Sequence, residues 1–169
     1  SRVREYHPHP DTDLLHRAFD LARQSPWGAK QDEAELLALA DIVATLKLDE
    51  TALAASIVLR AVTRGHIARD AVRAALGDSV AAIVAGVETL SNHTFRQSNH
   101  TDPENFRKML VAMARDVRVL LVKIADRLHA MRRLQDVPEE ARFDIAQETM
   151  DIYAPLANRL GIAWLKSEF

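Results

Sequence analysis

The chain has 169 residues, of which 48% are hydrophobic and 27% charged, a balance that excludes a disordered polypeptide or one dominated by membrane spans. Its formal net charge of −2 gives no strong field for a polyanion, so we expect no direct DNA binding. The sequence contains no cysteine, which excludes disulfides, thiolate catalysis and cysteine-based zinc sites. Without a signal-peptide pattern at its start, the sequence predicts a soluble, cytoplasmic protein with no membrane partner.

Helical periodicity runs through most of the chain and predicts an all-α, multi-helix bundle. Residues 1–11 are expected to form an extended segment, because His7 and His9 each precede a proline. The domain then fills residues 12–169, with helices near 12–23, 31–47, 50–64, 70–76 and 78–90; Asp49 is expected to cap the third, and Gly65 and Gly77 to end the third and the fourth.

The second half of the chain begins with a polar stretch over 91–102, which we expect to be a mobile loop. Asp102 and Pro103 then have the signature of a new helix start. The segment 116–131 is apolar on nearly all sides, which is typical of a central, buried helix. A last long helix follows Pro138, with Leu160 on its inward face, and is expected to kink at Pro155. Because the chain stops at Phe169 without a helix stop signal, we interpret it as a fragment of a longer protein.

Four polar side chains interrupt the apolar central helix: Lys123, Asp126, Arg127 and His129. Burying a carboxylate is costly unless it is paired or binds a metal. One interpretation is a structural ion-pair cluster, for example Asp126 with Arg159. The other is a present or former ligand site, with Asp126 on a metal and the cations on phosphate.

Three segments carry a resemblance to a known family. Residues 122–132 (VKIADRLHAMR) resemble the "K-(L/I)-A-D-R-x-H-N-M-R" helix of the RelA/SpoT family, whose members make and destroy the alarmone (p)ppGpp. Residues 152–162 (IYAPLANRLGI) match that family's corresponding block almost letter for letter, and residues 104–109 (ENFRKM) resemble the family's "E-N-F-R-K-M" helix start. The resemblance covers about residues 35–169 and implies an HD-type, hydrolase-like bundle. The active form of that domain hydrolyses the 3′-pyrophosphate of (p)ppGpp with manganese.

The family's catalytic pattern is largely replaced in this chain. It supplies the metal with an upstream His, an adjacent His-Asp pair and a later Asp, and uses a Glu-Asp pair to activate water. The later Asp is present as Asp126, but Leu59 and Arg60 stand at the His-Asp pair, and Thr63 and Arg64 at the Glu-Asp pair.

Two further departures affect the same region. The upstream His falls at about Glu35, which is at most a carboxylate substitute, and in the central helix Ala130 and Arg133 replace the family's Asn and Thr. Leu59 cannot bind a metal, and a cation at Arg60 would repel one. We therefore expect Arg60 or Arg64 to neutralise Asp126, and no metal in this domain unless hydrolase activity survives, in which case it would require manganese.

The resemblance implies a catalytically inactive hydrolase-like domain of a RelA-type GTP pyrophosphokinase, an enzyme of the stringent response. The domain would have a structural or regulatory role toward a magnesium-dependent synthetase domain outside this chain, and only outside regions would contact ribosome and tRNA. A vestigial pocket for (p)ppGpp or another guanine nucleotide would be lined by Lys123, Asp126, Arg127, His129, Arg132, Asn158 and Arg159. The alternatives are a residual manganese-dependent (p)ppGpp 3′-pyrophosphohydrolase and a helical dimerisation or partner-docking module with no ligand.

Overall fold

The structure is a computed structural model that describes residues 3–26, 28–30, 33–92, 111 and 115–169. Every regular element within these ranges is helical, which confirms the all-α prediction. The first half contains α1 (Val3–Tyr6), α2 (Thr12–Gln24), the 3-10 turn η1 (Gly28–Lys30), α3 (Glu33–Thr45), α4 (Glu50–Thr63), α5 (Arg69–Leu76) and α6 (Asp78–Asn92). The second half contains α8 (Val117–Arg132), η2 (Leu134–Asp136), α9 (Glu139–Glu148), the π turn η3 (Thr149–Tyr153), α10 (Ala154–Arg159) and α11 (Ala163–Glu168).

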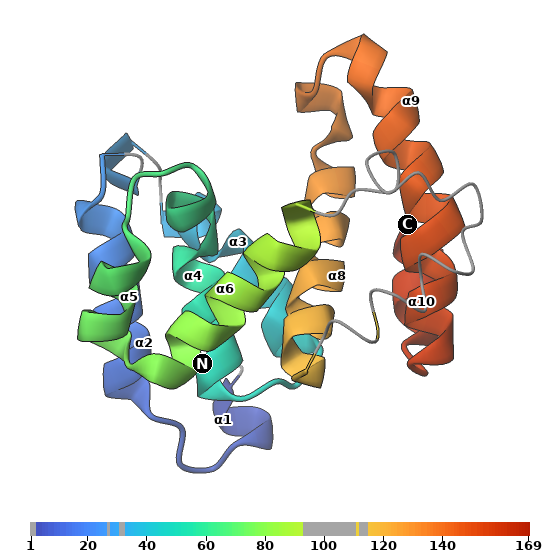
Figure 1. The fold of residues 1–169 in the computed structure, drawn as a ribbon. Helices are drawn as coiled ribbons and strands as arrows, with labels where there is room; N and C mark the ends of the chain where they lie inside the picture. Colours follow the sequence, from blue (N-terminus) through green and yellow to red (C-terminus); the bar gives the residue numbers. More distant parts are fainter. Residues whose placement is uncertain (1–2, 27, 31–32, 93–110, 112–114) are drawn as a thin grey trace.

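Helix α8 lies between two groups of helices (Figure 1). Helices α3, α4 and α6 pack against one side of it, and α9, η3 and α10 lie on the other. Its Val122, Ile124 and Leu128 have no exposed surface. This position explains why the sequence of α8 is apolar on nearly all sides, and the prediction of a central helix is confirmed.

The N-terminal segment differs from the extended conformation expected for residues 1–11. Val3–Tyr6 form the short helix α1, closed by a hydrogen bond from the His7 amide to the Val3 carbonyl. Val3 is buried, and the Tyr6 hydroxyl donates to the carbonyl of Leu48 at 2.9 Å. Each proline restricts only the residue before it, so Val3–Tyr6 can adopt a helix. The burial of Val3 and the hydrogen bond from Tyr6 stabilise this helix.

The crossing of α6 and α8 depends on a glycine. A Cβ added at Gly86 would lie 2.8 Å from both γ-methyl groups of Val119. The β-branched Val119 has little rotameric freedom in a helix, so it cannot easily turn away. Gly86 therefore allows α6 to approach α8 closely.

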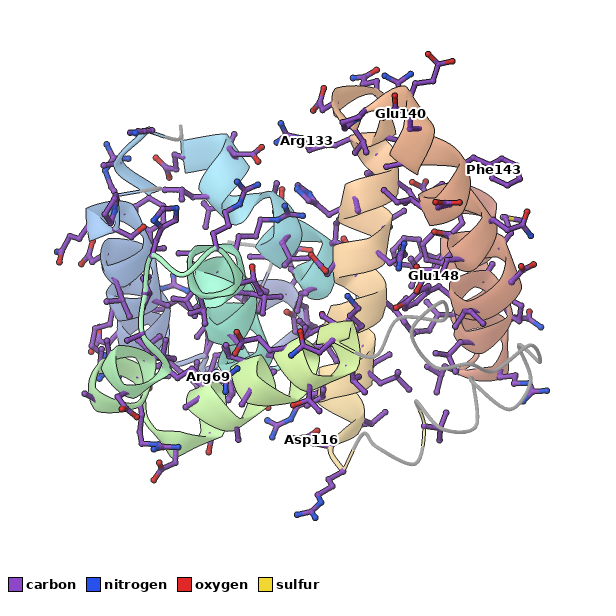
Figure 2. The ribbon with its side chains drawn as sticks, turned by 45° about the horizontal axis from the view of Figure 1, so that its top comes forward. Arg69, Asp116, Arg133, Glu140, Phe143 and Glu148 are labelled. Carbon is purple, nitrogen blue, oxygen red and sulfur yellow. The ribbon has the colours of Figure 1, made fainter. Side chains whose placement is uncertain are left out.

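The last helical run contains a π turn that the sequence analysis did not predict. Pro155 has no amide hydrogen and its ring needs space in the preceding turn, and the widened turn η3 ends at Tyr153, two residues before it. None of the residues of α9 is buried. Its Phe143 is 72% exposed and points away from the neighbouring helices (Figure 2).

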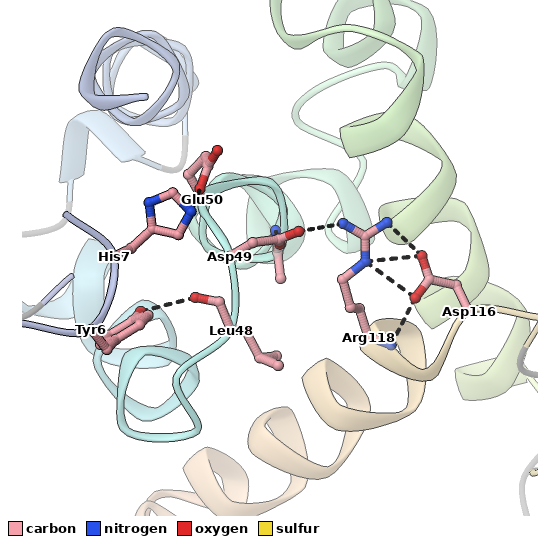
Figure 3. Close-up of polar contacts among 8 residues, drawn as sticks. Tyr6, His7, Leu48, Asp49, Glu50, Asp116 and Arg118 are labelled. Atoms are coloured by element: carbon pink, nitrogen blue, oxygen red, sulfur yellow. Dashed lines mark hydrogen bonds and ion pairs between the residues drawn. The ribbon is translucent and has the colours of Figure 1, made fainter. Parts of the chain in front are cut away.

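The start of α8 is tied to the start of α4 by Arg118 (Figure 3). The Arg118 guanidinium donates to Asp116 at 2.7 Å and also to Asp49, the residue that caps α4 by accepting from the Ala52 amide. The hydrogen bond from Arg118 is the main cause that lowers the pKa of Asp116 below its ordinary value. These contacts confirm the predicted cap at Asp49 and fix the register of α8 against α4.

Some predictions fall on residues outside the described ranges. Ser91 and Asn92 end α6, but the rest of the expected loop at 91–102 and the helix start at Pro103 lie outside them. No helix in the described part of the chain is long and apolar enough to cross a membrane.

Candidate functional site

Two cations contact the Asp126 carboxylate on α8. Arg60 of α4 places Nη2 at 3.4 Å from Oδ1, and Lys123, one turn away on α8, places Nζ at 3.5 Å from Oδ2. Both Arg60 and Asp126 keep about a quarter of their side-chain surface exposed. The prediction that Arg60 or Arg64 neutralises Asp126 is therefore confirmed for Arg60.

A second ion pair lies beside the first. Arg133, at the end of α8, pairs with Glu35 of α3 and also donates from Nε to Asp136 Oδ2 at 2.9 Å. Glu35 lies close enough to Arg60 to raise its pKa, and Arg64 and Arg133 lie close enough to lower it. The positions carried over from the family pattern thus gather from α3, α4 and α8 into one place. We call Glu35, Arg60, Lys123, Asp126, His129 and Arg133 the ionic cluster.

Burial shifts the pKa values of two groups in the ionic cluster, Arg60 and His129. It is the largest influence on the pKa of Arg60 and lowers it, while Asp126 and Glu35 oppose that shift; a guanidinium keeps its proton regardless. Burial also lowers the pKa of His129, and the charge of Arg60 lowers it further. His129 is only 5% exposed and its Nε2 has no hydrogen-bond partner. We therefore assign His129 as neutral at pH 7, so the cluster carries three cations against two carboxylates.

Lys123 is held in place from α6. Its Nζ donates to the hydroxyl of Ser91 at 2.9 Å, and the residue is only 8% exposed. A buried ammonium needs partners for its donors, and Ser91 and Asp126 supply them. The ammonium group of Lys123 therefore binds to Ser91 and Asp126 within the protein.

Arg127 faces the opposite group of helices. Its Nη2 lies 2.9 Å from Glu148 Oε2 of α9, and its guanidinium carbon lies 4.4 Å from the centre of the Tyr153 ring in η3. Burial acts to lower the pKa of Arg127, but Tyr153 and Glu148 together outweigh it and raise the pKa. Figure 2 shows Arg133 and Glu148 on opposite sides of α8, which separates the two groups of charges.

The remaining residues of the predicted pocket lie apart from the ionic cluster. Arg132 pairs with Glu168 of α11 at 2.7 Å, and Asn158 and Arg159 are exposed on α10. The seven side chains predicted to line one vestigial pocket thus do not converge. They lie on two sides of α8 and near its C-terminal end.

Leu59 and Thr63 stand where the family resemblance expects members of the two catalytic pairs, and both make contacts within the protein. Leu59 is 2% exposed and belongs to the hydrophobic core. Thr63 is exposed, and its hydroxyl donates to the Arg60 carbonyl at 3.2 Å.

Four residues that contribute to the ionic cluster or to the contacts of Arg127 were not predicted from the sequence. Arg133 was identified only as a substitution, although its spacing of seven residues from Asp126 places both on one face of a helix. Ser91, Glu148 and Tyr153 had no local signal, because their roles depend on how α6 and α9 pack against α8.

Metal binding would need several converging donors. In the described part of the chain, no three His, Asp or Glu side chains gather in a way that could hold a metal ion. The two carboxylates of the ionic cluster are each paired with at least one cation.

Comparison with known proteins places this chain in a family. Residues 17–163 match the HD domain family. The chain is 41% identical over 174 residues to a GTP pyrophosphokinase of Myxococcus xanthus, with 98% of this chain and 23% of the relative aligned. It is 37% identical over 171 residues to the bifunctional (p)ppGpp synthase/hydrolase SpoT of Escherichia coli, with 98% and 24% aligned. The GTP pyrophosphokinase rsh of Brucella ovis is 36% identical over 172 residues, with 99% and 23% aligned.

The chain spans about a quarter of the length of these relatives. The match over residues 17–163, the all-α architecture and the identities over nearly the whole chain agree with the motifs at 122–132 and 152–162. This chain therefore belongs to the HD domain family, as an HD domain of the RelA/SpoT type.

Proposed function

We propose that this HD domain does not hydrolyse (p)ppGpp and acts as a regulatory domain toward a synthetase domain of the same polypeptide. The observation that supports this most is the Arg60–Asp126 ion pair, with 3.4 Å between Nη2 and Oδ1. The family resemblance expects a metal-binding Asp at the position of Arg60 and a metal-binding His at the position of Leu59. This chain has a guanidinium and a core leucine instead.

Charge is the physical reason for the proposed loss of hydrolysis. Two unit charges of the same sign about 4 Å apart repel by about 4 kcal/mol at an effective dielectric constant near 20, and a divalent cation would be repelled more strongly. Arg60, Lys123 and Arg133 together oppose such an ion, and each carboxylate of the ionic cluster already has a cationic partner. We conclude that these residues do not fit a manganese ion.

The proposed partner is a synthetase domain that makes (p)ppGpp with magnesium. The names of the relatives support it, since two are GTP pyrophosphokinases and one is a bifunctional synthase/hydrolase. An exposed apolar surface supports a packing role: Phe143 and Met150 are 72% and 54% exposed and lie seven residues apart on the run α9–η3. The proposal places the protein in the cytoplasm, where GTP is available, and assigns ribosome and tRNA contacts to regions outside this chain.

A guanine nucleotide as a direct ligand of this domain has less support. Lys123 and Asp126 contact α4 and α6, whereas Arg127 contacts α9 and η3, so the predicted lining residues do not converge. Thermal unfolding of the chain with saturating (p)ppGpp tests this directly, because a ligand of the folded state raises the melting temperature. We expect no rise.

The hydrolase part of the proposal is tested by incubating the chain with (p)ppGpp and excess manganese and measuring pyrophosphate release. We expect release no faster than in buffer with manganese alone. Manganese-dependent release by the unchanged chain that Asp126→Asn abolishes would overturn the proposal. It would support instead the residual hydrolase, the alternative favoured by the SpoT relative.

The regulatory part is tested in the longer polypeptide by measuring (p)ppGpp synthesis from ATP and GTP. Phe143→Ser should change the rate about fivefold or more, the size of a typical interdomain coupling, because the exposed ring would lose its contact with the synthetase domain. Val117→Ser, at another exposed apolar residue, is the matched control. Equal rates in both variants and the unchanged protein would contradict this role for the α9 surface.

A further inference from the structure

A cavity of about 540 Å³ lies among α1, α2, α3 and α4, and its lining includes no member of the ionic cluster. Its floor consists of Ala40 and Ala44 of α3 with Leu53 and Ile57 of α4, all of them buried. The volume is within the range of small-molecule sites, which are concave and mostly apolar.

The size of the cavity follows from two alanines. Ala40 and Ala44 are four residues apart, so they lie on one face of α3, where larger side chains would fill the space. Half-buried Leu15 and Phe19 of α2 and Leu37 of α3 form the walls. The apolar surface of a bound ligand would therefore be covered by α2, α3 and α4, which removes it from water.

The rim of the cavity is charged and mainly acidic. Glu33 and Asp41 of α3 stand on the same helix face as Leu37, four residues before and after it, and both are exposed. The third polar group is His16 of α2, which is also exposed. Two carboxylates and one imidazole around an apolar interior favour a ligand with a cationic end.

We propose that this cavity binds a small amphipathic cation, whose aromatic or aliphatic body lies on the alanine floor and whose ammonium group lies at the rim near Glu33 and Asp41. The site is separate from the ionic cluster and does not depend on the function proposed above. It uses α3 and α4, the helices that also carry Glu35 and Arg60, so an occupant would contact the elements that hold the ionic cluster together.

The test uses three probes that share one apolar body and differ in charge: phenylbutylamine, phenylbutanol and phenylbutyrate. Binding to the chain is followed by the methyl NMR resonances of Leu37, Leu53 and Ile57, with affinities in the millimolar range expected for ligands of this size. The amine should bind most tightly and the carboxylate most weakly. No shift of these resonances with any probe, or equal affinity for all three, would overturn the proposal.

A variant of the rim tests whether its carboxylates contribute to binding of the amine. The double change Glu33→Gln and Asp41→Asn should weaken binding of the amine about two- to fivefold and leave the alcohol unchanged, because exposed charge contacts are modest. Changing Glu139 and Glu140, two exposed carboxylates at the start of α9, to Gln is the matched control and should change neither. An unchanged amine affinity in the rim variant would exclude the cationic class.

Ala44→Leu should fill the cavity and abolish binding of all three probes without lowering the melting temperature. Retained binding in a folded Ala44→Leu chain would place the probes elsewhere. If the same methyl resonances shift when only the concentration of the chain is raised, a second copy occupies the cavity and the assignment to a small cation is wrong.

Discussion

Arg60 and Lys123 each place a cation within 3.5 Å of the Asp126 carboxylate. Because Arg60 is partly buried, we expect its contact with Asp126 to contribute more to the free energy of unfolding than an exposed ion pair does. The coupling between Arg60→Gln and Asp126→Asn in a double-mutant cycle should be about 0.5–1 kcal/mol, since both side chains retain some exposure. Urea unfolding of the two single variants and the double variant measures it.

The control for this cycle is the pair Arg73 and Asp78, in which both side chains are mostly exposed. Solvent screens such a pair, so its coupling should be close to zero. A coupling between Arg60 and Asp126 no larger than that of the control would mean that their contact has no role in stabilising the ionic cluster.

His129 makes stability depend on pH. Its pKa is lowered from 6.5, mainly by burial and next by Arg60, so below pH 6.5 the unfolded chain binds a proton that the folded chain resists. Stability should therefore decrease as the pH falls from about 6.5 toward the lower folded pKa. His129→Gln should flatten this part of the profile in urea unfolding, whereas the exposed His66→Gln should not. An NMR titration of the His129 imidazole with a midpoint above 6.5 would contradict the lowered pKa.

The sequence could predict the Arg60–Asp126 contact because the family motifs aligned those positions and their charges are opposite. It could not predict the partner of Arg127, because neighbouring residues on a helix point about 100° apart and the sequence does not say which packed layer each one meets. In the structure Asp126 meets α4 while Arg127 meets Glu148 and Tyr153.

At the scale of elements, the α6–α8 crossing gives the sharpest prediction about stability. Gly86→Ala gains helix propensity of about 1 kcal/mol, but its Cβ would lie 2.8 Å from the Val119 methyl groups, and such overpacking costs about 1–3 kcal/mol. We expect net destabilisation in urea unfolding that disappears when Val119→Ala is also present. An alanine that stabilises the unmodified background would show that the two helices are not in close contact.

Helices with local start and stop signals were predictable. Asp49 caps α4 as expected, and Gly65 and Gly77 have the positive φ angles that end the helices before them. The elements that depend on distant contacts were not: α1 requires the hydrogen bond from Tyr6 to Leu48, and η3 is a widened turn before Pro155. Leu160 was expected to face inward but is 36% exposed.

In the molecule as a whole, α8 lies between the well-buried helices α3, α4 and α6 and helix α9, which is held less tightly. Helices α3, α4 and α6 contribute many buried residues, whereas α9 has none and is tied to α8 through Arg127 and Glu148. Arg127→Met should therefore speed hydrogen exchange in α9 and leave exchange in α4 and α6 unchanged. A uniform increase over all helices would mean that the two groups unfold as one unit.

We propose that the cationic side chains of the ionic cluster keep a metal ion out of this site. Titration with manganese, followed by electron paramagnetic resonance of the free ion, tests this without relying on activity. We expect the unchanged chain to bind no manganese up to about 1 mM, the weak end of ordinary ligand affinities, and the variant with Leu59→His and Arg60→Asp to gain binding. Loss of one equivalent of free-ion signal with the unchanged chain, prevented by Asp126→Asn, would contradict it.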